Sequence, residues 1–438
     1  MSAMTLDDAD RLLAGATGTT PAPDLVTHLA TYGPLSIPTR KDPQWGHRMI
    51  QAVTESGLLG RGGGGFPSGR KWDAVRRGGR APLVVINVLE GEPASAKDRV
   101  LSTYAPHLVL DGAEVAATVI GASEIVIAVA DHRELVAASF RTAAAERLEA
   151  GRARVTMSVR RPPGRYITGE ESALVSWLDQ RPARPFLRVD KSVPIRIGRR
   201  PVLVHNAETL SQVALIARHG PQWFRRLGTP DAPGSTLVTV TGSVRRPGVL
   251  EIELGTPVID ILDRAGLEEP LAGVLVGGYG GAWMPPAHLA TPYAPLPLAA
   301  VGAVVGAGVL VALPVGACGI AETARVARYM AGETAGQCGP CVFGLPAIAG
   351  DLERLWVGQA DAGSVERIVD RAAAVLGRGA CRHPDGVVRL VRSALTVFAA
   401  DVRSHAEGRP CAGHLAPTVM AFPAASPSRP AEADRGVS

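Results

Sequence analysis

Strand-like apolar runs alternate with helical segments through the first half of the chain, and this order constrains the fold more than any other feature. Strands are predicted at Leu83–Asn87, Glu124–Val129 and Arg154–Val159, with helices at Leu108–Ile120 and Arg133–Glu149 between them. A strand–helix–strand order favours a mostly parallel sheet with helices on its faces. The sequence therefore predicts an α/β, Rossmann-like domain, and a further helix at residues 44–55 leads into it.

A glycine-rich stretch precedes the first strand. Gly60–Trp72 reads G-R-G-G-G-G-F-P-S-G-R-K-W. Five glycines gather at its start, namely Gly60, Gly62, Gly63, Gly64 and Gly65. Such a loop can bring several backbone N–H groups against an anion, and Lys71 adds a positive charge. We expect a cradle for a nucleotide or flavin phosphate, with a flexible surface loop as the alternative. The spacing excludes a Walker loop, and the ordinary dinucleotide fingerprint fits poorly because no clean strand comes before the glycines.

Three polar turns follow predicted strands. The first is N-V-L-E-G-E-P, in which Glu90 and Glu92 stand two residues apart. The second contains Gly169, Glu170 and Glu171 and opens a helix that ends near residue 178; acidic residues at a helix start also complement its dipole without any ligand. The third runs from strand into helix at residue 206. Ligands of α/β sheets bind at the carboxyl ends of strands, so these turns are expected beside the glycine loop.

The second half of the chain changes character. A hairpin that turns at Arg245–Gly248, followed by a helix at Val258–Ala265, indicates a small β-grasp-like module from about residue 234 to 314. Helices predicted at Ile320–Gly332, Val342–Trp356, Ser364–Leu376 and Gly386–His405 suit a small bundle. The predicted parts are therefore a loose arm with one short helix near residues 7–13 (1–44), an α/β domain (45–233), the module (234–317), the bundle (318–408) and a disordered tail (409–438).

Composition narrows the possible partners. The net charge of +5 comes from arginine that is spread along the chain without a polybasic block, so no nucleic acid partner is expected. The apolar run 298–317 is about as long as a membrane span. Gly302, Gly306, Gly308 and Pro314 interrupt it, so two short strands around a glycine turn are favoured and no transmembrane segment is expected. The N-terminal residues lack a signal-peptide pattern, and we expect a cytoplasmic protein.

The cysteines indicate metal or redox chemistry. Cys338 and Cys341 form C-G-P-C before an apolar helix, and Cys381 lies farther along the chain. Thiolates at this spacing can bind a metal or cluster together with a distant third ligand. The same four residues also occur in redox dithiols, and two unpaired structural cysteines are a third interpretation. We interpret Cys318 as a buried small residue and Cys411 as an exposed bystander.

The chain resembles the NADH-binding, FMN-containing flavoprotein subunit of respiratory complex I and its relatives in bidirectional hydrogenases and formate dehydrogenases. The family motifs are G-R-G-G-A-G-F-P-T-G-x-K-W, N-A-D-E-x-E-P, G-x-Y-x-x-G-E-E-T-A-L, N-N-V-E-T and C-G-x-C-x-P-C with one distant cysteine. The matching segments, in the same order, are Gly60–Trp72, Asn87–Pro93, Gly164–Leu174, His205–Thr209 and Ala335–Cys341, with Cys381. The family also carries a soluble-ligand-binding β-grasp (SLBB, ubiquitin-like) module and a helical bundle where we expect them.

The resemblance implies roles for the matched residues. The glycine loop and Lys71 would hold the FMN phosphate, and Phe66 would stack on NADH. The residues around the flavin ring would be Asn87, Glu90, Gly169, Glu170, Asn206 and Thr209. Glu92 and Glu171 would help to place the ribose or nicotinamide, and Glu92 and Glu170 are the catalytic candidates. Cys338, Cys341 and Cys381 would hold an iron–sulfur cluster of the 4Fe–4S type.

Three departures from the family motifs indicate a divergent paralogue. Leu89 replaces an aspartate, His205 replaces an asparagine beside the flavin, and Ala335 replaces the first cluster cysteine. The cluster is then absent, is held by three cysteines with an outside ligand, or recruits a residue such as His383.

The resemblance favours an FMN-dependent NADH dehydrogenase that passes electrons to a ferredoxin or an iron–sulfur partner subunit, which could hold it at the membrane periphery. The alternatives are a degenerate flavin- or nucleotide-binding assembly subunit and a flavin-linked dithiol reductase that uses Cys338 and Cys341.

Overall fold

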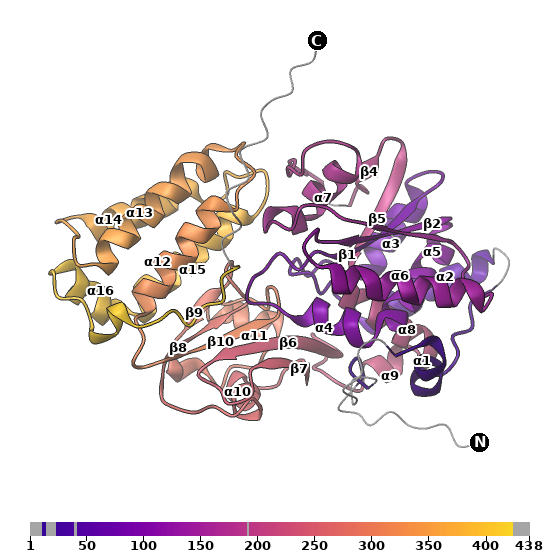
Figure 1. Cartoon of the computed structure of the whole chain (residues 1–438), viewed down its shortest axis with the longest axis horizontal. Helices are drawn as coiled ribbons and strands as arrows, with labels where there is room; N and C mark the ends of the chain where they lie inside the picture. The colour runs from indigo at the N-terminus through magenta and orange to yellow at the C-terminus, as the bar shows by residue number, and fades with distance from the viewer. Residues whose placement is uncertain (1–10, 15–22, 39–41, 191, 424–438) are drawn as a thin grey trace, which may run out of the picture.

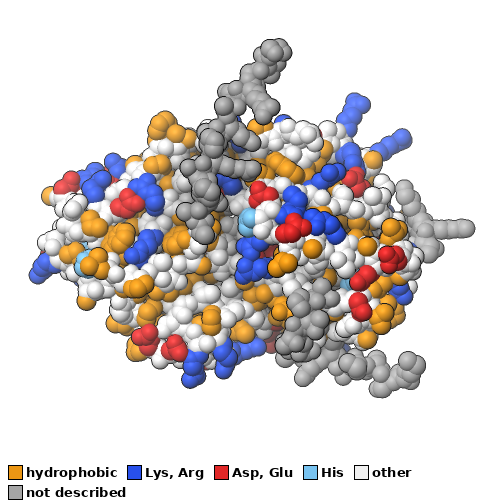
Figure 2. All heavy atoms as spheres, viewed as in Figure 1, with side chains coloured by type: hydrophobic (Ala, Val, Ile, Leu, Met, Phe, Trp, Pro, Cys, Tyr) orange, Lys and Arg blue, Asp and Glu red, His pale blue; other side chains and the backbone are white. Residues whose placement is uncertain are grey.

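A computed structural model describes residues 11–14, 23–38, 42–190 and 192–423 of the chain. Figure 1 shows three parts: an α/β domain, a second and smaller sheet with short helices, and a bundle made by the C-terminal helices. On the face in Figure 2, Lys and Arg lie among Asp and Glu and do not form one continuous basic area. Within the described residues, every helix is too short or too polar to cross a bilayer.

The first sheet has the strand order β3-β2-β1-β5-β4. Its strands are β1 (Leu83–Val88), β2 (Glu124–Val129), β3 (Thr156–Arg160), β4 (Arg196–Ile197) and β5 (Arg200–Asn206). The pairs β1–β2, β1–β5 and β2–β3 are parallel, and the short β4 is antiparallel at the edge. The predicted parallel sheet is therefore confirmed, with strands close to their expected bounds.

Helices cover both faces of this sheet (Figure 1). They are α1 (Leu25–Tyr32), α2 (Pro43–Ser56), α3 (Ser68–Arg77), α4 (Lys97–Tyr104), α5 (Pro106–Ile120), α6 (Glu134–Glu149), α7 (Glu171–Leu178), α8 (Ala207–His219) and α9 (Pro221–Phe224), with a short 3-10 turn at Ile167–Gly169. Helix α5 is buried along nearly its whole length and packs against α8. This close approach needs Gly112, because a Cβ there would lie 1.8 Å from the carbonyl oxygen of Leu210.

The N-terminal arm is more ordered than the sequence suggested. Leu12 is fully buried, and the Arg11 guanidinium lies 3.8 Å from the ring centre of Trp223. On α1, His28 shares a hydrogen bond of 2.8 Å with Asp111 of α5. Residues 11–14 form bends and a turn rather than a helix, and residues 7–10 of the predicted helix lie outside the described part.

The second sheet has the order β7-β6-β10-β8-β9. Its elements are β6 (Ser235–Gly242), β7 (Gly248–Glu253), α10 (Val258–Arg264), β8 (Leu271–Val276), β9 (Ala282–Met284), a 3-10 turn at Pro286–His288, α11 (Pro295–Ala300) and β10 (Val309–Pro314). β6 and β7 form the predicted hairpin, and β10 runs parallel to β6 in the middle of the sheet, as a β-grasp requires. The run 298–317 holds the end of α11, a glycine turn and one strand, so the expectation of two strands was wrong.

The bundle follows. Its elements are α12 (Gly319–Gly332), a π-helical turn at Pro340–Gly344, α13 (Leu345–Trp356), α14 (Ser364–Val375), α15 (His383–Val397) and α16 (Ala399–Ala406), with a 3-10 turn at Ala412–Leu415. The single helix predicted at Gly386–His405 is two helices. The chain breaks at Phe398, whose ring packs edge-on against Trp283 of the second sheet at 5.1 Å.

The expectation of a disordered tail from residue 409 was wrong for its first part. Residues 409–423, which we call the C-terminal strap, lie against the bundle. Trp356 donates its indole N–H to the His414 carbonyl at 2.7 Å, and Met420 is only 3% exposed. Residues 424–438 lie outside the described part.

Candidate functional site

The glycine loop (residues 60–65) borders a hollow between the two sheets. An isolated β-bridge between Leu59 and Pro67 joins the two ends of the loop. The Gly60 N–H also donates a hydrogen bond of 2.9 Å to the Phe66 carbonyl. Gly63 and Gly65 have φ angles of 93° and 58°, which side chains rarely permit. Residues 62–65 are exposed, and the hollow beside the loop has a volume of about 200 Å³ and opens to solvent. This is the shape that a bound anion with a larger body needs.

The predicted polar turns meet at the carboxyl ends of the strands. Asn87 of β1 and Asn206 of β5 are register partners. The Asn87 amide donates to the carbonyl oxygen of Gly169 at 3.0 Å, which draws the second polar turn to the end of β1. The Arg61 N–H of the glycine loop donates to Thr209 Oγ1 at 2.9 Å. The sequence-based expectation that these segments gather is thus met, whereas the roles of the individual residues stay predictions.

Lys97 is a charged residue of the site that the sequence analysis missed. Its ammonium group is buried and lies 2.9 Å from Asp98, 2.9 Å from Glu208 and 3.2 Å from the Asn206 side chain. The Glu208 carboxylate continues to the second sheet, where it accepts the Leu237 N–H at 3.1 Å. Lys97 lines the hollow, and these carboxylates keep its ammonium group charged. The only signal in the sequence was its position just after the first polar turn.

The two glutamates of the first turn point in different directions. Glu90 has a left-handed backbone (φ 44°), and its carboxylate accepts the Asp98 N–H at the start of α4 at 2.8 Å. Glu92 reaches the second sheet and accepts the Tyr279 N–H at 2.9 Å. Burial raises the pKa of each carboxyl to about 7, with the Asp98 carboxylate adding to the effect at Glu90. Each can therefore hold or release a proton near neutral pH.

The second polar turn has a structural role of its own. Glu170 caps α7, because its carboxylate accepts the N–H groups of Ser172 and Ala173 at 2.8 and 3.0 Å. Burial raises the pKa of Glu170. Glu171 forms an ion pair of 2.8 Å with Lys71, whose ammonium group also donates to a β5 carbonyl at 2.7 Å. Lys71 thus ties the helix after the glycine loop to this turn, and its predicted phosphate contact stays a prediction.

His205, the replacement for a family asparagine, faces the protein core. It is 4% exposed, and its Nε2 accepts the indole N–H of Trp72 at 2.9 Å. Burial, and then the charge of Lys71, keep the pKa of His205 well below its ordinary value, so the imidazole is neutral. The departure at this position therefore forms a buried hydrogen bond between β5 and α3.

Three predicted metal ligands line one small hollow. Cys338, Cys341 and Cys381 border a hollow of only about 10 Å³, and Ala335 borders it as well. Ala335 thus occupies the place from which a fourth cysteine would reach in. Among the described residues, a different group has three potential ligand atoms within 4.8 Å of one another. The sulfurs of these three cysteines therefore do not all lie that close together, as the ligands of a single ion would. That spacing fits a cluster, which holds its ligands farther apart.

His383 is poorly placed to replace the missing cysteine. Its Nε2 bonds the Met330 carbonyl at 2.8 Å, and its ring packs edge-on against Tyr166 at 5.5 Å. Burial lowers the pKa of His383. His383 is not among the residues that line the cysteine hollow, so the described part of the chain supplies three ligands there.

One turn connects the two sites. Ile167 lines the cysteine hollow, and two residues later the Gly169 carbonyl accepts from Asn87 at the strand ends. The N–H of Tyr166 donates to Glu333 at 2.7 Å, which ties the same turn to the end of α12. The glycine cradle fits a flavin phosphate, and the three thiols fit three of the four ligands of a cluster.

Comparison with known proteins places each part. The Nuo51 FMN-binding domain model matches residues 53–215, the SLBB domain model residues 237–268, and the NADH-ubiquinone oxidoreductase-F iron-sulfur binding region residues 321–405. The second NADH-quinone oxidoreductase F subunit of Rhizobium meliloti is 30% identical over 382 residues, which are 84% of this chain and 90% of the relative. The F subunit of the Streptomyces coelicolor enzyme is also 30% identical, over 83% of this chain and 84% of its own.

Solved structures agree. The NAD+-reducing NiFe hydrogenase in the air-oxidized state matches with a TM-score of 0.77 and 32% identity over 90% of this chain. In the H2-reduced state the TM-score is 0.75 over 86% of this chain. This chain spans 66% and 64% of the length of those hydrogenase chains. On the extent and identity of these matches, the chain belongs to the family of NADH-quinone oxidoreductase F subunits.

Proposed function

We propose that this protein is an FMN-dependent NADH dehydrogenase subunit that sends electrons onward through an iron–sulfur cluster held by Cys338, Cys341 and Cys381. The observation that carries the proposal is the turn at residues 164–174, which contacts Asn87 at the end of β1 through Gly169 and lines the cysteine hollow through Ile167. Bound FMN would accept a hydride from NADH, and the cluster would pass electrons on one at a time.

The protein residues bind and orient the reactants. The N–H groups of the exposed glycine loop would hold the phosphate, and Lys97, which is paired with Asp98 and Glu208, lines the same hollow. Asn87 and Asn206, at the strand ends, and Thr209, in the first turn of α8, would fix the position of the ring system. Phe66 is half-buried at the end of the loop and offers an aromatic face for NADH to stack on.

Glu92 and Glu170 are the candidate proton-holding groups. Burial raises the pKa of both carboxyls, to about 7 for Glu92. Glu170 already accepts hydrogen bonds from the start of α7 through Oε2, so it acts by holding the turn in place. Glu92 belongs to the first polar turn, its carboxylate accepts the N–H of Tyr279, and it can exchange a proton near neutral pH.

Electrons would pass from the cluster to a ferredoxin or to an iron–sulfur partner subunit. Relatives named as subunits of NADH-quinone oxidoreductase support assembly with other chains. We propose that the fourth ligand of the cluster is not a side chain of this protein, because Ala335 stands where the family has another cluster cysteine. A dithiol reductase that uses Cys338 and Cys341 is the alternative, and the match of residues 321–405 to an iron–sulfur binding region favours the cluster.

The function can be tested by rapid mixing of anaerobic protein with NADH, comparing the natural chain with Cys381→Ser. We expect NADH to bleach the flavin bands of both proteins at similar rates, while Cys381→Ser loses iron and no longer reduces an added ferredoxin. Unchanged iron and ferredoxin reduction in Cys381→Ser would exclude the proposed cluster path. A natural chain whose flavin ignores NADH would exclude the dehydrogenase.

A further inference from the structure

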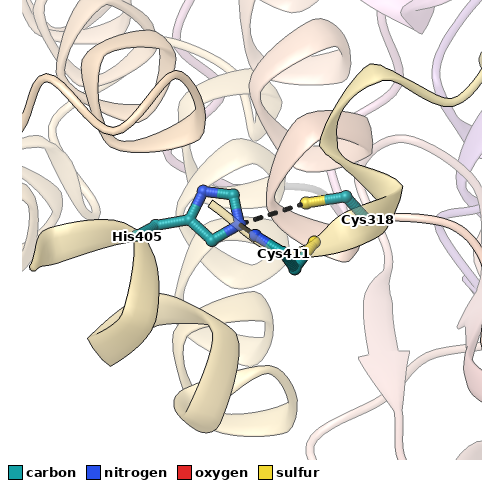
Figure 3. Close-up of side chains that lie close together, drawn as sticks. All are labelled: Cys318, His405 and Cys411. Atoms are coloured by element: carbon teal, nitrogen blue, oxygen red, sulfur yellow. Dashed lines mark hydrogen bonds between the residues drawn. The ribbon is translucent and has the colours of Figure 1, made fainter. Parts of the chain in front are cut away.

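A second group of potential metal ligands lies in the bundle, apart from the cysteine hollow. Cys318 precedes α12, His405 belongs to α16, and Cys411 starts the segment after α16. Their ligand atoms all lie within 4.8 Å of one another. Figure 3 shows the imidazole edge of His405 turned toward the two cysteines, which come from separate segments of the chain. Folding therefore brings two thiols and one imidazole together at one place in the bundle.

The imidazole of His405 is oriented like that of a metal ligand. Its Nδ1 lies 2.9 Å from the Trp356 carbonyl oxygen and 3.2 Å from that of Leu355. Carbonyl oxygens only accept hydrogen bonds, so the proton is on Nδ1 and the lone pair is on Nε2. This Nε2 faces the sulfur of Cys318 at 3.7 Å and accepts the Cys411 N–H at 3.1 Å. A backbone carbonyl that fixes the far ring nitrogen is the usual support of a metal-binding histidine.

The separations fit one ion and not a cluster. Tetrahedral zinc with bonds of about 2.3 Å to sulfur and about 2.05 Å to nitrogen places those two ligand atoms about 3.6 Å apart. The observed Cys318 to His405 separation is 3.7 Å. Two thiols and one imidazole are the ligand set that zinc prefers over magnesium or calcium, which take oxygen ligands.

We propose that Cys318, His405 and Cys411 bind one Zn²⁺ ion, with a solvent molecule as the fourth ligand. Binding releases the two thiol protons to solvent and leaves the oxidation states unchanged. The Cys411 N–H gives up its bond to His405 when the lone pair of the imidazole turns to the metal. This site is independent of the proposed dehydrogenase function.

The ion would fasten the C-terminal strap at its first residues. Beyond Cys411, the Glu322 carboxylate of α12 accepts the N–H groups of Val419 and Met420 at 3.1 and 3.4 Å. At the far end, the hydroxyl of Tyr279 donates to the Ala421 carbonyl. Without the ion, the first part of the strap would be held mainly by single hydrogen bonds, so metal removal should loosen residues near 411.

A disulfide between Cys318 and Cys411 is the competing interpretation. The two thiols are close enough to share a hydrogen bond, yet all five cysteines of the chain are free in the structure. With a disulfide, the Nε2 lone pair of His405 would keep its hydrogen bond from the Cys411 N–H, so the imidazole alone does not exclude the oxidised pair. The test must therefore distinguish bound zinc from an oxidised pair.

The experiment measures zinc and iron in the full-length protein, purified without oxygen and without chelators, for the natural chain, Cys318→Ser, Cys411→Ser and Cys381→Ser. We expect about one zinc per chain in the natural protein and in Cys381→Ser, which serves as the matched thiol control. In Cys318→Ser and in Cys411→Ser, the affinity for zinc should fall by more than about 100-fold. Loss of a residue that only supports a metal ligand typically lowers metal affinity by about 10- to 100-fold. Cys411 is half-buried at the strap, so that variant should fold even if Cys318→Ser does not.

Two further measurements make the result decisive. Zinc X-ray absorption should show two sulfur ligands and one nitrogen, and Co²⁺ added to the metal-free natural chain should give the charge-transfer and ligand-field bands of a tetrahedral thiolate site. A chelator should increase protease cleavage near residue 411. Zinc retained in Cys411→Ser, zinc lost only in Cys381→Ser, or a Cys318–Cys411 disulfide found by mass spectrometry would each overturn the proposal.

Discussion

The side chain of Asn87 donates a hydrogen bond of 3.0 Å to the backbone carbonyl of Gly169. This single contact joins the end of the central strand to the turn that leads to the cysteine hollow. It explains how segments far apart in the sequence can position one flavin and one cluster together.

Replacing Asn87 with Ala should weaken flavin binding. The Gly169 carbonyl loses its donor, and a lost hydrogen bond of this kind costs about 1 kcal/mol, so we expect about fivefold weaker FMN binding. Fluorescence titration of the flavin-free protein with FMN measures the change. Gln51→Ala, on the exposed face of α2, should bind FMN like the natural chain, and equal affinity in Asn87→Ala would contradict the role of this contact.

The glycine loop can be tested with a matched pair of glycines. Gly65 (φ 58°) and Gly121 (φ 78°) both have left-handed backbones and open space where a Cβ would lie. Alanine at either position should cost about 1 kcal/mol of unfolding free energy, because the left-handed conformation disfavours a side chain. Only Gly65→Ala should also weaken FMN binding, by about tenfold or more. If both variants bind FMN equally, the loop is not the phosphate cradle.

Ala335 offers a direct test of the cluster. Ala335→Cys would place a fourth thiol at the same hollow as the other three. We expect slower loss of the cluster's absorption in air, because a protein thiol replaces the outside ligand, with Ala335→Ser behaving like the natural chain. A rate of loss in air that is unchanged in Ala335→Cys would contradict a cluster in this hollow.

Glu92 should make stability depend on pH. Its pKa rises from the ordinary 4.5 to about 7 on folding, so the folded state favours the proton. The unfolding free energy contributed by this group is present below pH 4.5 and is lost as the pH rises toward 7, by up to about 3 kcal/mol.

Denaturant unfolding between pH 4.5 and 8 measures this slope. Glu92→Gln should flatten it, and the remainder should come partly from Glu90, whose pKa is also raised to about 7. The exposed Glu149→Gln should keep the natural slope. A slope that is the same in Glu92→Gln would contradict the burial of a proton on this carboxyl.

The hydrogen bond between Trp72 and His205 should contribute to the stability of the fold, separately from flavin binding. His205→Asn should leave the buried Trp72 indole without its acceptor, at a cost of about 1–3 kcal/mol. In a Trp72→Phe background the same change should cost little. Thermal unfolding of the four proteins completes the double-mutant cycle, and a coupling energy near zero would show that the contact contributes nothing.

The sequence identified the strand ends well. Asn87 and Asn206 lie at the ends of strongly apolar strands, and the expected parallel order of those strands predicted that their turns would gather. That β1 and β5 are direct neighbours came only from the structure. Lys97 was missed because a lysine after a turn usually faces solvent, and only the packing of Glu208 and Asp98 around it shows that it is buried.

Other features depended on tertiary contacts that leave little trace in the sequence. Cys411 lies in a segment rich in proline and alanine, without helical periodicity, and the fold alone brings it to Cys318 and His405. The helix break at Phe398 was equally hidden, because the apolar spacing continues through it. At the break, the Phe398 ring packs against Trp283, a contact that the sequence does not show.

The most direct test of the account is an anaerobic NADH titration of the natural protein, with FMN, iron and sulfide determined on the same sample. The account predicts stoichiometric FMN that NADH bleaches, together with iron and sulfide that are lost in Cys381→Ser. Electron paramagnetic resonance should then show a reduced cluster after NADH is added. A protein that binds no FMN, or whose FMN is not bleached by NADH, would contradict the central claim.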